Sequence, residues 1–327
     1  MDLEKILKPL AGQVHPNLLV GLKTSDDAAV FQVGDRAVIQ TVDFFAPVVD
    51  DPYDYGAIAA ANSMSDVYAM GGEVLFALNV AAFPEDLPED IVLEIVRGGA
   101  EKMAEGGGVV VGGHTVIDKE PKFGFCVTGM ASPSDVTTKD ALQPGDFLVL
   151  TKPIGTGAIT TAHKAERVDE AHLRTAVESM LTLNRAPARL LRRAGVRAVT
   201  DVTGFGLLGH ASEMAAASGV RLRIESRTVP LLPGAQQYAE AGLLPGGVGR
   251  NRAWLLGADE DGDARVEITD GVDTVLADLL MDPQTSGGLL AGVPAESLEG
   301  IGDAFDAAGL QLWVIGQSVA GSGIEVV

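Results

Sequence analysis

Short runs of apolar, often β-branched residues alternate with longer helical patterns along most of this chain. The run Ala37–Val42 predicts a strand that ends at Asp43, and the Ala-rich stretch Tyr55–Met70, stopped by Gly71-Gly72, predicts a helix. Alternation of this kind is typical of α/β and α+β domains. With 327 residues, the chain has room for about two such domains.

The same alternation continues to the C-terminus. We expect further strands at Val74–Ala82, Val109–Val111, Lys122–Ala131, Phe147–Thr151, Arg197–Val202, Val220–Glu225 and Gln311–Gly316. We expect further helices at Pro88–Glu105, Glu170–Arg193 and Gly206–Ser218. The strand at Val109–Val111 is expected to be buried. Turn signals around Ser132–Gly145 interrupt the pattern, so we divide the chain into domains 1–133 and 134–327.

Charge and cysteine content exclude several functions. The formal net charge is −21, which repels nucleic-acid phosphates and anionic lipid, so we expect no nucleic-acid or membrane partner. The single cysteine, Cys126, rules out an intrachain disulfide and a cysteine-based zinc site. The sequence has no long apolar run and no signal-peptide pattern at its N-terminus, so we expect a soluble, cytoplasmic protein. A chain this acidic needs metal ions to hold an anionic ligand.

Aspartates recur at the ends of predicted strands and on one helix face. Asp27, Asp66 and Asp201 have small or apolar neighbours, which indicates that they do not lie on an open surface. Asn62 lies four residues before Asp66 and shares its helix face. One interpretation is a carboxylate cluster that gathers Mg²⁺ around a polyphosphate. The other is that such acids cap helices or lie in solvated turns, and the pattern alone leaves both open.

Other features are less specific. Glycines frame the strand before Gly112-Gly113-His114-Thr115 and suit either a phosphate-approaching loop or a tight turn. Gly204–Gly209 spells G-x-G-x-x-G between a strand and a helix, but Asp201 would face the pyrophosphate of a dinucleotide, so an NAD site stays a distant alternative. We expect Cys126 to be a buried, inert thiol. The basic residues Arg185, Arg189, Arg192 and Arg193 are expected to be solvated or to pair with acids four residues away on the same helix, rather than to bind phosphate.

Several strings together resemble the selenophosphate synthetase (selenide, water dikinase) family. The strings are Asn17–Gly21 leading into Ser25–Val30, Thr41–Phe45, Ala61–Gly72, Gly112–Thr115, Thr200–His210 and Asp282–Leu290. The string Asp-Asp-Ala-Ala-Val and the helix string Ser-Asp…Ala-Met-Gly are shared with a superfamily that includes aminoimidazole ribonucleotide synthetase, thiamine-monophosphate kinase and the hydrogenase maturation factor. The strings Thr-Asp-Val-Thr-Gly-Phe-Gly-Leu-Leu-Gly-His and Asp-Pro-Gln-Thr-Ser-Gly-Gly are more specific to selenophosphate synthetase.

The resemblance implies a reaction, a fold and a set of site residues. The reaction converts ATP, selenide and water into selenophosphate, phosphate and AMP. The fold is a two-domain α/β (α+β) arrangement like that of aminoimidazole ribonucleotide synthetase, a homodimer whose N-terminal domains build a β-barrel across the two copies. By motif, Mg²⁺ would bind Asp27, Asp66 and Asp201. ATP would contact Thr24, Ser25, Asp26, Asp43, Asp66, Gly113, His114 and Thr115, directly or through metal.

One departure concerns the N-terminus. The family carries a glycine-rich segment with a cysteine or selenocysteine and a lysine before the helix that resembles Met1–Leu7, so we expect the catalytic residues upstream of Met1. Our leading hypothesis is a start codon placed after a selenocysteine codon; trimming and a natural non-catalytic relative are the alternatives. For the chain as written we expect Mg-ATP binding without selenophosphate formation. Other open alternatives are a thiamine-phosphate kinase-like enzyme and a non-catalytic nucleotide-binding protein.

Overall fold

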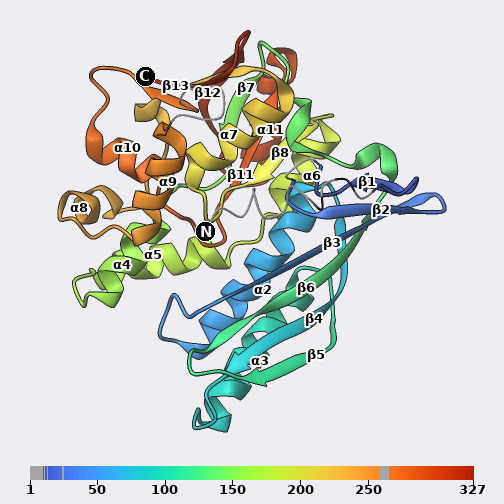
Figure 1. Ribbon diagram of the computed structural model, residues 1–327, viewed down its shortest axis with the longest axis vertical. Coiled ribbons are helices and arrows are strands. Elements are labelled where there is room, and N and C mark those ends of the chain that lie inside the picture. The colour runs from blue at the N-terminus through green and yellow to red at the C-terminus, as the bar shows by residue number, and fades with distance from the viewer. Residues whose placement is uncertain (1–9, 11, 13, 24–25, 258–264) are drawn as a thin grey trace.

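Two β-sheets, each accompanied by helices, make up the protein in its computed structural model (Figure 1). The structure describes residue 10, residue 12 and residues 14–23, 26–257 and 265–327. The N-terminal sheet has the strand order β1-β2-β3-β6-β4-β5. Its strands are β1 (Leu18–Val20), β2 (Ala29–Val33), β3 (Arg36–Phe45), β4 (Glu73–Phe83), β5 (Val110–Ile117) and β6 (Lys122–Ala131). The fold is thus of the mixed α/β class that the sequence predicts.

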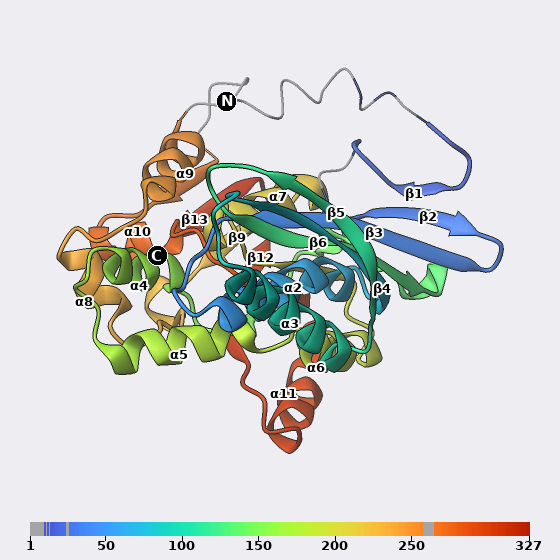
Figure 2. The same cartoon turned by 90° about the horizontal axis from the view of Figure 1, so that it is seen from below.

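Helices α2 (Pro52–Ala69) and α3 (Glu89–Glu105) lie on the same side of this sheet (Figure 2). Asp51 begins α2 because its side chain accepts a hydrogen bond from the Asp54 backbone N–H. The two helices cross in close backbone contact: a Cβ on Gly56 would lie 1.8 Å from the Ile95 carbonyl oxygen. Small residues at the crossing allow α2 to pack close to α3 in the interior of the protein. Nearly every side chain of α2 after its first turn is buried.

The C-terminal sheet has the order β10-β13-β9-β12-β7-β11-β8. Its strands are β7 (Phe147–Leu150), β8 (Ala198–Asp201), β9 (Arg221–Ile224), β10 (Val266–Ile268), β11 (Leu289–Val293), β12 (Trp313–Val319) and β13 (Gly323–Val326). Strand β11 runs antiparallel to both β7 and β8. The carboxyl ends of β7 and β8 and the start of β11 therefore lie at the same end of the sheet. This end of the sheet faces α2.

Eight α-helices and several short 3₁₀ turns surround the second sheet in the described ranges. The α-helices are α4 (Thr156–Lys164), α5 (Glu170–Leu181), α6 (Arg185–Arg193), α7 (Gly206–Ser218), α8 (Ala235–Glu240), α9 (Gly246–Leu256), α10 (Thr274–Leu280) and α11 (Leu298–Ala307). The 3₁₀ turns are η2 (Pro133–Asp135), η3 (Lys139–Ala141), η4 (Ser226–Thr228) and η5 (Ala295–Ser297). None of the helices that the structure describes is long and apolar enough to span a membrane.

One apolar core extends across the two sheets. It joins Ile39 and Tyr68 of the N-terminal half to Leu191, Val199 and Phe305 of the C-terminal half. Because apolar side chains from both halves share this core, their burial contributes to holding the two sheets together at the level where the polar site is built.

Three details differ from the sequence predictions. The strand predicted as buried at Val109–Val111 is the start of β5, which begins at Val110. Among the described strands β5 pairs with β4 alone, at the edge of the sheet, and Val111 is exposed. The predicted helix Glu170–Arg193 is two helices, because Pro187 cannot continue a helix and falls in the first turn of α6. Cys126 lies in the predicted strand but is only half-buried, with the Gln40 side-chain amide 3.3 Å from its Sγ.

Candidate functional site

Strand β3 and helix α2 face each other with polar side chains. Along β3, Thr41 and Asp43 alternate with the outward-facing Val42, so both point toward α2. The Thr41 hydroxyl donates to Asp66 Oδ2 at 2.5 Å, and the Asn62 side-chain amide donates to Asp43 Oδ2 at 2.9 Å. The predicted shared face of Asn62 and Asp66 is confirmed, and these contacts fix the two N-terminal carboxylates.

The C-terminal domain adds a third buried carboxylate. Asp201, the last residue of β8, is 1% exposed. The preceding Thr200 donates its hydroxyl to Asp27 Oδ1 at 2.7 Å, although the two residues are 173 apart in the sequence. The structure therefore brings Asp27, Asp66 and Asp201, predicted as one set, to the boundary between the two domains, with Asp26 and Asp43 beside them.

The acids in this cluster repel one another. Burial, reinforced by the charge of Asp27, raises the pKa of Asp26 and of Asp201 to about 7. Burial and then the charges of Asp201, Asp43 and Asp27 raise the pKa of Asp66 well above its usual value. Burial and Asp27 also raise the pKa of Asp43, which the Asn62 hydrogen bond partly offsets. The cluster carries more negative charge than its surroundings neutralise.

Two buried carboxylate oxygens in the cluster, Asp27 Oδ2 and Asp201 Oδ2, have no hydrogen-bond partner among the described residues. Buried carboxylate oxygens without a partner are costly, and an oxygen-ligated hard cation such as Mg²⁺ would satisfy them. No group of three or more His, Cys, Asp or Glu in the described ranges is already arranged around a common metal position. The donor chemistry fits Mg²⁺, which commonly takes one or two protein carboxylates and completes its shell with water and phosphate.

A loop from the far end of the chain closes the cluster. The Ser286 backbone N–H donates to Asn62 Oδ1 at 2.8 Å, so Asn62 bridges this loop and Asp43. The Asn184 amide donates to Ser65 Oγ and to the Gly287 carbonyl oxygen, both at 2.8 Å. Helix α2 is thus held from the C-terminal domain on the face that carries the site.

The same loop caps a helix. Asp282 Oδ2 accepts the backbone N–H groups of Gly157 and Ala158, and Gln284 Oε1 accepts those of Gly155 and Thr156. All the free N–H groups at the start of α4 are satisfied in this way. The string Asp282–Gly288, which the resemblance singles out, therefore has a structural role in fixing α4 and the closing loop.

A buried lysine braces the loop as well. Lys152, just after β7, donates to the Thr182 carbonyl oxygen at 2.6 Å and to that of Ser286 at 2.8 Å. Burial lowers its pKa to about 7. Lys152 and Asn184 do not stand out in the sequence, because they act on backbone carbonyl groups or on partners far away in the chain. Ser286 lies in a string that the resemblance singles out.

The predicted nucleotide residues fall into separate groups. Thr24 and Ser25 lie outside the described residues. Gly113, His114 and Thr115 lie on the exposed edge strand β5. Gly113 is in register with Asp43 through β4 and β6, which places it three strand spacings, about 14 Å, from β3. Within one chain, this trio is not brought to the carboxylate cluster.

The G-x-G-x-x-G string forms the turn after Asp201 and the start of α7. Gly206 has φ +70°, and a Cβ there would lie 2.7 Å from the Met281 carbonyl carbon. Its glycine is therefore needed for the turn that packs against the closing loop. The exposed Phe205 ring lies 5.7 Å from both the His210 and Trp254 rings.

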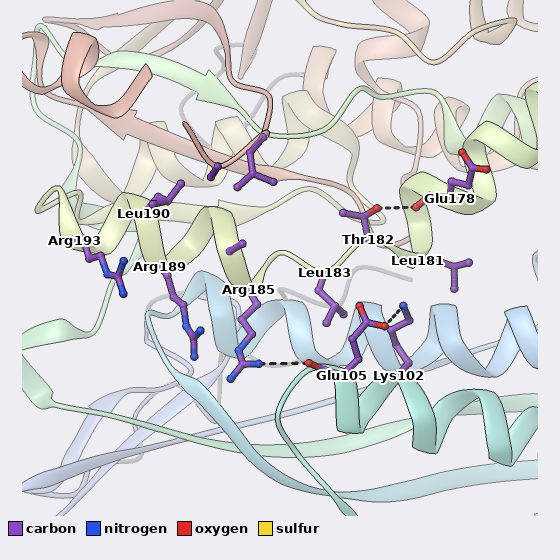
Figure 3. A pocket seen from close by; sticks show the side chains of 13 residues that line it. Lys102, Glu105, Glu178, Leu181, Thr182, Leu183, Arg185, Arg189, Leu190 and Arg193 are labelled. Atoms are coloured by element: carbon purple, nitrogen blue, oxygen red, sulfur yellow. Dashed lines mark hydrogen bonds and ion pairs between the residues drawn. The ribbon is translucent and has the colours of Figure 1, made fainter. Parts of the chain in front are cut away.

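The basic face of α6 forms an ion cluster at a second point between the domains. Arg189 binds Glu73 of β4 with two hydrogen bonds of 2.7 Å, and Arg185 and Arg192 lie within 3.5 Å of the same carboxylate. The predicted i,i+4 pairing is wrong for these three arginines in the part of the chain that the structure describes, because their acidic partner is on β4 rather than on α6. A groove of about 760 Å³ lies beside these arginines, lined by α3, α5, α6 and the segment after α11 (Figure 3). None of the clustered aspartates lines it.

Two family models and several curated relatives match this chain over most of its length. The model "AIR synthase related protein, N-terminal domain" matches residues 25–131, and the corresponding C-terminal model matches residues 143–327. The selenide, water dikinase of Caldanaerobacter subterraneus is 49% identical over 298 residues, 91% of this chain and 84% of that protein. The protein of the same name from Myxococcus xanthus is 43% identical over 330 residues, 100% of this chain and 92% of its own.

Solved structures show the same fold at lower identity. The thiamine monophosphate kinase of Aquifex aeolicus has a TM-score of 0.70 at 18% identity, covering 99% of this chain and 95% of its own. The hydrogenase maturation protein HypE in complex with ATP has a TM-score of 0.64 at 17% identity, covering 98% and 88%. At these identities the likeness concerns the fold alone.

Proposed function

The chain belongs to the selenide, water dikinase family, and we propose that it transfers phosphoryl groups from ATP to give selenophosphate, AMP and phosphate from selenide and water. The observation that carries this proposal is the buried carboxylate cluster built from both domains, with two oxygens left without partners. Relatives that share 43–49% of its residues over most of the chain support the choice of reaction.

We propose Mg²⁺ at Asp27, Asp66 and Asp201, and ATP against Asp26, Asp43 and Asp66. The excess negative charge of the cluster supports a requirement for divalent cations, because a polyphosphate would otherwise be repelled. When bound, Mg²⁺ would neutralise charge that develops on the transferred phosphoryl group. Thr24, Ser25 and the trio Gly113–Thr115 remain part of the proposed ATP site on the strength of the resemblance.

The chain's own residues prepare the site in two ways. Thr41 and Asn62 orient the carboxylates of Asp66 and Asp43 before any ligand binds. The closing loop, anchored by Asn62 at Ser286, covers the cluster from the C-terminal side and limits water. Preoriented charges in a water-poor site act on a phosphoryl group without having to reorganise during the reaction.

We further propose a homodimer in which the N-terminal sheets of two copies pack together. The sheet face opposite α2 and α3 leaves large apolar side chains exposed, among them Val42, Phe44 and Leu78. Exposed apolar faces of this kind mark protein interfaces. A second copy would also bring a β5 strand, with Gly113, His114 and Thr115, to a carboxylate cluster that lacks them within one chain.

We keep the proposed division into domains 1–133 and 134–327. Strand β6 ends at Ala131 and β7 begins at Phe147, so the division falls between the two sheets. The gap between the two family matches, residues 132–142, supports the same position.

The reaction is tested by ³¹P NMR on the protein expressed with all in-frame codons upstream of Met1. We expect ATP, selenide and Mg²⁺ to give selenophosphate, AMP and phosphate in equal amounts. With thiamine phosphate in place of selenide, we expect no turnover. Phosphorylated thiamine phosphate without AMP would instead favour the kinase alternative, and an unchanged ATP pool in every mixture would favour a nucleotide-binding protein.

The homodimer is tested by sedimentation of two matched variants. Phe44→Asp places a charge on the exposed sheet face, whereas Leu93→Asp places one on exposed α3, where the side chain is 63% exposed. We expect the first variant to be monomeric and the second to remain dimeric. A wild-type protein that sediments as a monomer at micromolar concentration would refute the proposal.

A further inference from the structure

The segment that joins the two domains has a side chain in the candidate site. Residues 132–142 lie between the ranges that the two family models match. In the middle of this segment, Lys139 is 4% exposed, although lysine is rarely buried without partners. Neither the motifs nor the family matches assign this residue a role.

The backbone of the segment is fixed to both domains. On one side, the Thr137 backbone N–H donates to the Met70 carbonyl oxygen at the end of α2. On the other side, Thr138 pairs with Ala198 of β8, and the Lys139 carbonyl oxygen accepts from Ser218 Oγ at 3.0 Å. Lys139 is therefore held in place by its main chain, independently of the contacts of its ammonium group.

The ammonium group lies between acids of the two domains. Lys139 Nζ is 2.9 Å from Asp27 Oδ1 and 2.8 Å from Glu213 Oε2 of α7. The Lys139 backbone N–H also donates to Asp26 Oδ2 at 3.2 Å. Glu213 is in turn 3.3 Å from His210 Nδ1, so it has a second partner on its own helix, whereas Asp27 depends on Lys139 for its only cationic contact among the described residues.

This arrangement uses one oxygen of Asp27 and leaves the other free. Oδ1 receives Lys139 and the Thr200 hydroxyl, while the buried Oδ2 has no hydrogen-bond partner in the described ranges. We propose that Lys139 is a positioning residue, which locks the Asp27 carboxylate through Oδ1 so that Oδ2 is presented to a divalent cation. The proposal rests on the cation site of the proposed function and extends it to a residue of the inter-domain segment.

Outer contacts of this type orient metal ligands, and their loss commonly weakens metal binding by about 10–100-fold. A purely structural ion pair between Lys139 and Glu213 would behave differently, because replacing either residue would remove the same contact. Lys139 and Glu213 form the same pair, but only Lys139 touches Asp27. Variants at these two positions therefore separate positioning from simple stabilisation.

The test measures binding of Mn²⁺, as a spin-active substitute for Mg²⁺, by electron paramagnetic resonance on the full chain. The matched variants are Glu213→Gln and the double variant Lys139→Met/Glu213→Gln, which leaves no unpaired carboxylate at position 213. We expect the double variant to bind Mn²⁺ about 10–100-fold more weakly than wild type, and Glu213→Gln to stay within about fivefold. Thermal unfolding followed by circular dichroism confirms that both variants are folded.

Three other outcomes of the Mn²⁺ titrations would overturn the proposal. Equal affinities for the double variant and Glu213→Gln would overturn the positioning role and leave Lys139 as a structural pair. Tighter binding by the double variant would overturn it too, because Lys139 would then compete with the cation. A wild-type protein that binds no Mn²⁺ would refute the cation site of the proposed function, and the inference with it.

Discussion

Two ion clusters join the domains of this protein, and they are built in opposite ways. Around Glu73, three arginines of α6 surround one carboxylate whose pKa is lowered, chiefly by its hydrogen bonds with Arg189. Around Asp66, several carboxylates crowd together, and burial and the charges of neighbouring acids raise the pKa values of Asp66 and Asp201. The Glu73 side chain is about one-third exposed, whereas Asp66 and Asp201 are almost wholly buried.

The difference distinguishes a structural contact from a candidate ligand site. The Glu73 carboxylate is fully engaged by arginines, so it stabilises the folded state without a ligand. In the aspartate cluster, Asp27 Oδ2 and Asp201 Oδ2 have no hydrogen-bond partner among the described residues, so their burial costs free energy. Buried charge that the protein does not compensate is the stronger indication of a ligand site.

The largest expected effect comes from removing one uncompensated charge. Asp201→Asn should weaken Mg-ATP binding by about 100-fold or more, because it removes a carboxylate that faces the proposed cation. Its thermal unfolding temperature at pH 7.5 should equal or exceed that of wild type, because the substitution relieves repulsion. Calorimetric titration with Mg-ATP and thermal unfolding measure the two quantities. A variant that binds like wild type would contradict the functional reading of the cluster.

A second expected effect is a dependence of stability on pH. Asp26 and Asp201, with pKa values near 7 when folded and 3.8 as reference, bind protons more tightly in the folded state. The free energy of unfolding should therefore fall as pH rises from about 4 to 7 in the absence of divalent cations, by on the order of 3 kcal/mol for each of these carboxyl groups. Saturating Mg²⁺ should flatten this slope. Urea unfolding at several pH values, with chelator or Mg²⁺, makes the measurement; identical slopes in both would argue against a cation here.

The smallest expected effect concerns the arginine-rich cluster. Glu73→Gln should lower the free energy of unfolding by about 1–2 kcal/mol, since it removes a partly exposed, hydrogen-bonded charge. Mg-ATP binding should stay unchanged, in contrast with Asp201→Asn. Denaturant unfolding and the same titration test both points. If Glu73→Gln instead weakened Mg-ATP binding as strongly, the two clusters would not differ in the way we infer.

The sequence indicated which aspartates lie in the candidate site better than it indicated which contacts hold them there. Asp27, Asp66 and Asp201 could be chosen because small or apolar neighbours signal burial, and Asn62 follows from helix periodicity. Lys139 could not be chosen, because its turn-rich surroundings predict a boundary and its partners Asp27 and Glu213 are far away in the sequence. Long-range pairing of this kind leaves no local pattern.

The fold shows the same division. The long predicted strands and helices of the N-terminal half exist, because their periodicity and their stop signals agree. The exposure of β5 was missed, since whether a strand lies at an edge depends on sheet order rather than on its own residues. The break between α5 and α6 had a local signal, Pro187, which sits within an otherwise helical pattern.

The contact between Asn62 and Ser286 has a consequence for how the protein is made. The two residues are 224 positions apart in the sequence. Strand β3 pairs with β2 on one side and with β6 on the other, so it is paired on both sides only after β6 has been synthesised. On the ribosome, helix α2 emerges long before the loop that covers its polar face. The newly made N-terminal half therefore carries its crowded aspartates open to water, where repulsion is screened, and the site closes only when almost the whole chain has been synthesised.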